Sequence, residues 1–191
     1  MEYTLTDKYK LINEEVKKHT SKNPITIAIS LMKKDFVNVH GPEHHYLDGA
    51  CFLVAYANAG GKIELDSALS ELAERTIKMP GAMCGHWGVC GSTTSVGSAL
   101  SIIHEVGPLS ATDYYKDDMQ YTSMAINKMS AIGGPRCCKR NAFLSLSQAV
   151  QFVKEKYKID MELTDVKCGF YSLNKQCIGI RCPYFSNEKQ N

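Results

Sequence analysis

The chain has 191 residues, enough for one domain that buries a substantial core without disulfide staples. Its hydrophobic fraction of 44% and charged fraction of 22% are those of an ordinary globular protein, which excludes a disordered or fibrous class. Its 22 basic and 20 acidic side chains give a formal net charge of +2, too small for the basic surface that binds nucleic acid.

Apolar residues recur at helical spacing along most of the chain. Pro24 can begin a helix because its missing N–H costs nothing in the first turn, and the Gly60-Gly61 pair is a strong helix end. Residues 110–113 resemble a capping box, with Asp in place of Glu. The expected helices, in chain order, cover residues 6–19, 24–37, from 43 or 44 to 58, from 66 or 67 to before 80, 92–105, from about 112 to 132, and 143–157.

From residue 159 onward the apolar residues no longer recur at helical spacing. Residues 160–166 alternate like a short strand, and the remainder is a loop region that carries cysteines. Neither a repeat nor a linker divides the chain. We therefore predict a mainly α fold: a single-domain helical bundle over residues 1–191, with a helical core over about 6–157 and a small irregular cysteine-bearing C-terminal lobe over about 158–186.

Two features of the sequence bear on where the protein acts. The first 20 residues lack the apolar core of a signal peptide, and the longest apolar runs are too short to cross a bilayer. We therefore expect a cytoplasmic protein with no membrane or nucleic-acid partner. Disulfides are rare in reducing cytosol, so the eight cysteines favour metal binding or thiol chemistry.

The cysteines divide into one core residue and seven candidate ligands. Cys51 lies in an apolar run and is expected to be a small buried hydrophobe. The others fall at loops or helix starts, where irregular backbone lets several thiolates converge on one metal. This placement predicts a metal or iron–sulfur site whose candidate thiol ligands are Cys84, Cys90, Cys137, Cys138, Cys168, Cys177 and Cys182.

The tail carries three of these thiols in the pattern Cys168-x8-Cys177-x4-Cys182-Pro183. Such a segment gains little from a core of its own, so a metal could supply the free energy that orders it. A proline after the last cysteine also ends some ferredoxin runs, although the spacing differs, and zinc sites more often carry Cys-x2-Cys pairs. The expected cofactor is an iron–sulfur cluster or zinc, and unpaired structural thiols are the alternative.

A glycine-rich segment over residues 84–91 precedes a predicted helix. Its glycines let the backbone approach a bound group, and the helix N-terminus should lower the pKa of Cys90. His86 would be the base if Cys90 were a nucleophile. A tight turn between two closely packed helices explains the same glycines equally well.

Residues 40–45 place three imidazoles and a carboxylate within six positions. His40 is expected on a loop, with Glu43 and His44 in the first turn of the next helix. His40 and His44 are candidate metal ligands, and Glu43 is a candidate for acid–base work. Helix capping and surface exposure are the plainer explanation.

The adjacent Cys137 and Cys138 lie among three basic residues, Arg136, Lys139 and Arg140. Neighbouring side chains diverge, so one cysteine would be a ligand while the other packs or serves as a reactive thiol. The three cations would stabilise a thiolate or bind an anionic cofactor. A solvated loop is the alternative.

Four motifs in this order resemble an uncharacterised, cysteine-rich domain family of anaerobic bacteria and methanogenic archaea. The resemblance covers about residues 35–186 and implies a shared fold and shared ligands, but no activity. Some members are fused to methyltransferase-like or radical-SAM modules, which implies a separate partner protein of that kind for this chain. The motifs are His40-Gly41-Pro42-Glu43-His44-His45, Cys84-Gly85-x-Trp87-Gly88-x-Cys90-Gly91, Gly133-Gly134-Pro135-Arg136-Cys137-Cys138-Lys139-Arg140 and Cys177-x-Gly179-x-Arg181-Cys182-Pro183.

The sequence leaves three hypotheses. The leading one is a metal- or iron–sulfur-binding protein of anaerobic redox, sulfur or one-carbon metabolism. The second is a metal-independent enzyme in which Cys90 or Cys138 is the nucleophile and a histidine is the base. The third is a structural zinc domain that binds a partner protein. Whether the chain is an enzyme at all stays open at this point.

Overall fold

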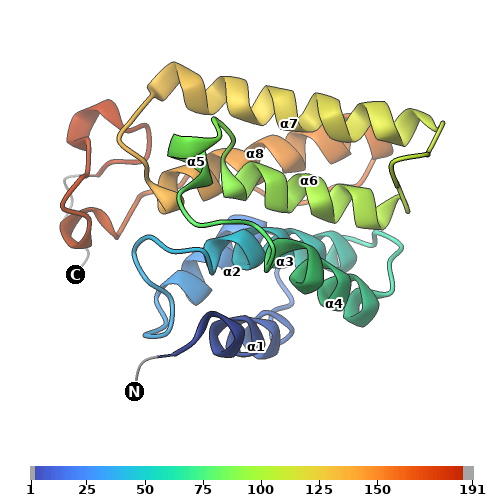
Figure 1. Ribbon diagram of the computed structural model, residues 1–191, viewed down its shortest axis with the longest axis horizontal. Coiled ribbons are helices and arrows are strands. Elements are labelled where there is room, and N and C mark those ends of the chain that lie inside the picture. Colours follow the sequence, from blue (N-terminus) through green and yellow to red (C-terminus); the bar gives the residue numbers. More distant parts are fainter. Residues whose placement is uncertain (1–2, 187–191) are drawn as a thin grey trace.

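The computed structural model describes residues 3–186, and within them the chain is helical without a β-strand (Figure 1). The predicted mainly α fold is therefore confirmed. The elements are α1 (Leu5–Val16), α2 (Pro24–Met32), α3 (His44–Asn58), α4 (Leu65–Thr76), α5 (Met83–His86), α6 (Gly91–Ile103), α7 (Asp113–Ile132) and α8 (Cys138–Tyr157), followed by the 3-10 turns η1 (Tyr171–Leu173) and η2 (Gly179–Arg181). Among the described helices, none combines the length and apolar character that a membrane crossing requires.

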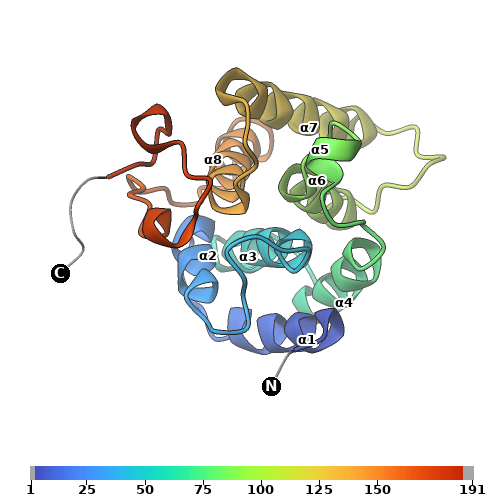
Figure 2. The same cartoon turned by 60° about the vertical axis from the view of Figure 1, so that its left-hand side comes forward.

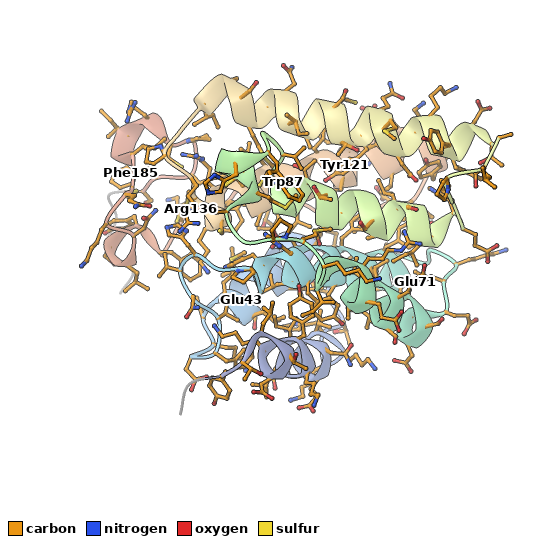
Figure 3. The ribbon with its side chains drawn as sticks, in the orientation of Figure 1. Glu43, Glu71, Trp87, Tyr121, Arg136 and Phe185 are labelled. Atoms are coloured by element: carbon orange, nitrogen blue, oxygen red, sulfur yellow. The ribbon has the colours of Figure 1, made fainter. Side chains whose placement is uncertain are left out.

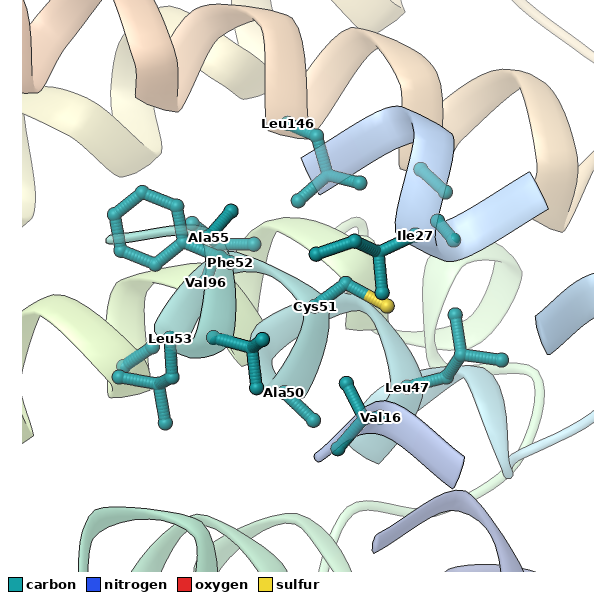
Figure 4. Close-up of a cluster of buried hydrophobic side chains, with 14 of the residues drawn as sticks. Val16, Ile27, Leu47, Ala50, Cys51, Phe52, Leu53, Ala55, Val96 and Leu146 are labelled. Carbon is teal, nitrogen blue, oxygen red and sulfur yellow. The ribbon is translucent and has the colours of Figure 1, made fainter. Parts of the chain in front are cut away.

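Helix α3 is the centre of the molecule, because its residues 44–56 are all buried. A helix that is apolar on every side needs neighbours on every side. It contacts α1, α2, α4, α6 and α8, which surround it in Figure 2. Cys51 is fully buried on this helix beside Val16, Ile27 and Leu47 (Figure 4), so its predicted core role is confirmed.

Helices α6, α7 and α8 contact one another and form the second half of the bundle. The crossing of α3 and α6 is close because Gly49 has no side chain there. A Cβ on Gly49 would lie 2.6 Å from Ser95 Oγ, and the Gly49 N–H donates to that oxygen at 2.9 Å. This close crossing holds the beginning of α6 against the first turns of α3.

Two local predictions were wrong. Residues 160–166 are irregular, since the segment reaches a neighbour through the Glu162 N–H to the carbonyl of Lys22 but has no adjacent strand to form a ladder. The capping box expected over residues 110–113 is also wrong: Ser110 Oγ accepts from the Gly107 N–H, and the N-cap of α7 is Thr112, whose side chain makes no cap hydrogen bond within the described chain. By contrast, Asn23 caps α2 with bonds to the N–H groups of Ile25 and Thr26.

Three helices begin at the same end of the bundle, next to the C-terminal lobe. Figure 1 shows α3, α6 and α8 starting there, while α7 ends there. Each helix N-terminus carries a partial positive charge from its free N–H groups. The fold therefore gathers three positive helix ends around the cysteines and histidines that lie in their first turns.

Candidate functional site

Four thiols from two separate segments surround one small space in the C-terminal lobe. Cys137 is the N-cap residue of α8, and the other three cysteines come from the irregular tail. The space has a volume of about 20 Å³ and is lined by Cys137, Lys139, Arg140, Phe143, Cys168, Phe170, Tyr171, Asn174, Cys177, Cys182, Tyr184 and Phe185. The fold thus brings together the three tail cysteines that the sequence grouped and adds Cys137 to them.

A repeated local turn presents the three tail sulfurs. Cys168 Sγ accepts from the backbone N–H of Phe170 at 3.4 Å, and Cys177 Sγ accepts from that of Gly179 at 3.5 Å. The backbone N–H of Tyr184, two residues after Cys182, donates in the same way to the Cys182 thiol. An N–H aimed at sulfur stabilises a thiolate. The same turn therefore prepares each tail cysteine to carry negative charge.

Cys137 receives two donors of its own. The backbone N–H of Arg140 lies 3.5 Å from Cys137 Sγ, and Asn174 Nδ2 lies 3.7 Å from it. The first bond is a helix cap made by sulfur, at the positive end of α8. Cys137 is thus held in place by both the helix and the lobe.

Burial affects the pKa of two of these thiols. It raises the pKa of Cys168 and Cys182, and the neighbouring thiols of the lobe raise both further. The guanidinium of Arg140 opposes this effect at Cys182. Together, four thiolates would repel one another in this space unless a cation joined them, which is the chemistry of a metal or cluster site.

The basic residues of the third motif are not a solvated loop. Lys139 is 1% and Arg140 5% exposed. Arg140 Nη2 donates to the carbonyls of Gly133 and Pro135 at 2.9 Å each, so it fixes the loop that leads into α8. Of the three cations proposed to bind a cofactor, these two line the four-thiol space, whereas Arg136 is exposed.

A second, larger cavity lies where α3, α6 and α8 begin. In the view of Figure 3, Arg136 at its wall lies between Phe185 of the lobe and Trp87 beside α5. The cavity has a volume of about 290 Å³. It unites three motifs that are far apart in the sequence, and its walls include His40, His44, His45, Asp48, Cys84, Cys90, Arg136, Cys137, Cys138 and Asn141.

Asp48 is the residue of this cavity that sequence reasoning missed. Its carboxylate is completely buried, and neither oxygen has a hydrogen-bond partner among residues 3–186. The nearest imidazole atom, His44 Nδ1, is 3.9 Å from Oδ1, beyond hydrogen-bond distance. The signal was present in the sequence: a carboxylate one helical turn after His44 in a helix that is otherwise apolar.

His45 lies against the start of α6. A Cβ on Gly91 would lie 2.2 Å from the imidazole, so only glycine fits there. Within the described chain His45 Nδ1 has no hydrogen-bond partner, and burial lowers the pKa of this histidine. The pKa of His45 therefore lies below the ordinary 6.5, and its Nδ1 is available for a partner from outside the described chain.

Two of the four thiols that line the cavity, those of Cys90 and Cys138, are more basic than the sequence predicted. Burial raises the pKa of Cys90, and the Asn141 amide, which donates to Cys90 Sγ at 3.2 Å, offsets this only in part. Burial raises the pKa of Cys138 to about 12, with Asp48 and Cys90 adding to the effect. The expected lowering at Cys90 was wrong, because burial outweighs the N–H groups of the helix end.

His40 connects the cavity to the lobe. Its Nδ1 accepts from the Cys138 N–H at 3.4 Å, which assigns the proton to Nε2. Nε2 then donates to Asn174 Oδ1 at 3.1 Å, and the amide of Asn174 reaches Cys137 Sγ. His40 lies on the loop, as predicted, but its two nitrogens are occupied by protein partners.

Lys139 and His44 form a buried pair between the two spaces. Lys139 Nζ donates to the Asn38 carbonyl at 2.9 Å and to His44 Nε2 at 3.1 Å, and it lies 5.1 Å from the ring centre of Phe170. Burial lowers the pKa of Lys139 to about 8. His44 Nε2 therefore accepts a hydrogen bond from Lys139, and His44 Nδ1 lies on the side of Asp48, 3.9 Å from Oδ1.

Two candidate catalytic residues lie elsewhere. Glu43 is buried but turns away from the cavity: it accepts from Lys8 Nζ at 3.3 Å and from the Asn38 N–H at 2.7 Å. Burial opposes its ionisation, yet backbone N–H groups keep the pKa of Glu43 low. His86 is exposed on α5, outside the cavity walls that residues 3–186 form, whereas Cys84 of the same segment lies in them.

Comparison with known proteins gives a family but no activity. Within residues 3–186, no three His, Cys, Asp or Glu side chains form a group that could already hold a metal ion. No curated protein matches the sequence, and no solved structure matches the fold. A family model described as "Family of unknown function (DUF5714)" matches residues 12–185, so the chain belongs to this uncharacterised family.

Proposed function

We propose that the protein binds an iron–sulfur cluster in its C-terminal lobe through Cys137, Cys168, Cys177 and Cys182. The observation that carries this proposal is the set of four thiols around one space of about 20 Å³, each with an N–H donor at its sulfur. Four cysteine thiolates are the usual ligands of such clusters, and hydrogen bonds to sulfur tune their potentials.

A cluster suits this lobe better than a single zinc ion for two reasons. The tail contains no Cys-x2-Cys pair, which structural zinc sites commonly use. A [4Fe–4S] cluster also binds each of its four cysteines through a different iron atom, so its ligands need not meet around one centre as the ligands of zinc do. The lobe would then serve redox chemistry, in anaerobic redox, sulfur or one-carbon metabolism, with a separate partner protein.

The nucleophile hypothesis has weaker support. A cysteine attacks as its thiolate, so a nucleophile needs a lowered pKa or an adjacent base. The pKa values of Cys90 and Cys138 are instead raised by burial, and His40, the imidazole bonded to the Cys138 N–H, presents no free nitrogen to that thiol. Both thiols are neutral at pH 7 unless a cation binds beside them.

The test is purification without oxygen, followed by measurement of iron, zinc, acid-labile sulfide and visible absorption. We expect iron and sulfide in the wild-type protein and their loss in Cys177→Ala, which removes an exposed ligand. Cys84→Ala is the matched control, because it removes a thiol outside the lobe. Zinc without sulfide would favour the structural zinc domain, and equal iron in Cys177→Ala and the wild type would refute the cluster assignment.

A further inference from the structure

Asp48 poses an energetic problem that the rest of the fold does not solve. An ionised carboxylate without a partner in a protein interior costs several kcal/mol, and buried charges are normally paired or bound to metals. Asp48 is fully buried, lines the 290 Å³ cavity, and has no hydrogen bond within residues 3–186. The nearby cation does not neutralise it directly, since Lys139 donates to Asn38 and His44 instead.

The groups around Asp48 lack the same kind of partner. Among the described residues His45 Nδ1 has no hydrogen-bond partner, and the thiols of Cys90 and Cys138 lie in the same cavity. Carboxyl, imidazole and thiol groups therefore surround one volume, with the exposed Arg136 as a further residue of its wall.

The missing partner is best explained as a metal ion. An anion would be repelled by Asp48, and an ammonium group would satisfy the carboxylate but leave the thiols and the imidazole unchanged. A borderline transition metal accepts oxygen, nitrogen and sulfur ligands together. The side chains would turn inward to reach it, and the cavity leaves room for this movement.

We propose that the cavity is a second site, which binds a divalent transition-metal ion through Asp48, His45, Cys90 and Cys138. The site is separate from the four-thiol lobe and shares no ligand with it. The supporting Asn141 amide would hold Cys90, while Cys138 begins helix α8. Arg136 at the wall of the cavity would attract an anionic ligand toward the bound ion.

A titration with Zn²⁺ tests this second site without depending on the first. The protein is prepared as Cys177→Ala, so that the lobe lacks one ligand, and the metal-free form is titrated without oxygen. We expect one Zn²⁺ bound per chain and a rise in the melting temperature. Adding Asp48→Asn should weaken binding by about tenfold or more.

The Asp48→Asn variant also distinguishes a role of Asp48 as a metal ligand from a purely structural role. Because Asp48→Asn removes a buried carboxyl group without a hydrogen-bond partner among the described residues, it should raise the melting temperature of the metal-free protein while reducing its response to Zn²⁺. Asp118→Asn is the matched control: Asp118 also lacks a hydrogen-bond partner in the described chain and lies 3.9 Å from a histidine, His104, but lines a different cavity. It should leave the Zn²⁺ response unchanged.

Three results would overturn the second site: no Zn²⁺ binding in the Cys177→Ala protein, an unchanged response in Asp48→Asn, or an equal loss in Asp118→Asn. If Asp48→Asn does not fold, His45→Gln gives the same test, with the same expected loss of affinity. Failure of the cluster assignment leaves a Zn²⁺ site that is sensitive to Asp48. Failure of the second site leaves iron and sulfide that depend on Cys177.

Discussion

Gly179 determines the turn that presents Cys177 to the lobe. Its φ of +56° lies in the left-handed region, which only glycine adopts without strain, and its N–H donates to Cys177 Sγ. A Cβ at this position would meet no atom within 4 Å, so space is not the constraint. The backbone conformation alone accounts for glycine at this position.

Gly179→Ala should therefore weaken the lobe by about 1–2 kcal/mol through backbone strain. We expect a lower iron content after anaerobic purification and faster loss of iron to a chelator. Gly85→Ala is the control, since Gly85 has open space around it and no left-handed φ. Equal iron retention in the two variants would show that the turn does not hold a ligand.

At the scale of elements, α7 and α8 are joined by one buried carboxylate. Asp117 accepts from Lys156 Nζ and from the Tyr157 hydroxyl, at 3.0 Å each. Burial opposes ionisation of Asp117, but these two hydrogen bonds outweigh it and lower its pKa below the ordinary 3.8. A carboxyl group whose pKa is lowered by folding contributes stability above its unfolded pKa, and this contribution is lost as the pH falls through the folded value.

We expect Asp117→Asn to lower the free energy of unfolding by about 1 kcal/mol at pH 7, because Lys156 is partly exposed and solvent screens the pair. The difference from the wild type should vanish as the pH falls well below 3.8. Urea titrations at several pH values measure this difference in the free energy of unfolding. Asp113→Asn, which removes an exposed pair on the same helix, should change little at any pH; a constant difference for Asp117→Asn would contradict the ionic explanation.

The sequence predicted elements well where glycine or proline interrupts the helical pattern. The bounds of α3 agree because Gly60-Gly61 ends it, and α7 ends at the predicted Ile132. The start of α8 was placed five residues late, since Lys139 and Arg140 read as solvated residues but are buried in its first turn. Polarity was a misleading guide there, because both cations bind carbonyl groups in the interior.

The candidate site was predictable only in its parts. The seven cysteines outside the core were named as candidates from their positions at helix starts and loops. Their division into a lobe and a cavity depends on α3, α6 and α8 beginning side by side, which is a tertiary arrangement without a local sequence signal. The sequence shows Asp48 one helical turn after His44 in a mostly apolar helix, but only the structure shows that its carboxyl oxygens lack a hydrogen-bond partner among the described residues.

At the scale of the whole molecule, the lobe and the helical bundle differ in what holds them together. The bundle has a continuous hydrophobic core around α3, whereas Phe170 is the one strongly buried apolar residue of the described tail after residue 165. With so little core of its own, the lobe would gain most of its order from the cofactor that we propose for its thiols. The lobe should therefore be able to unfold locally while the bundle stays intact.

Removal of the lobe cofactor should expose this difference. We expect amide hydrogen exchange over residues 168–184 to become fast when iron is chelated, while the amides of α3 keep their protection. Mass spectrometry of peptides from both regions, with and without the cofactor, provides the measurement. Equal protection of the tail in both states would mean that packing alone orders it.

Cys137 and Cys138, joined by one peptide bond, lie where the two spaces meet. Cys137 lines both the four-thiol space and the larger cavity, whereas Cys138 lines only the larger cavity among the described walls. Consecutive Cα atoms are about 3.8 Å apart, so a path of a few covalent bonds runs from one sulfur to the other. With both proposed sites loaded, this dipeptide would link a ligand of one site covalently to a ligand of the other, at the start of α8.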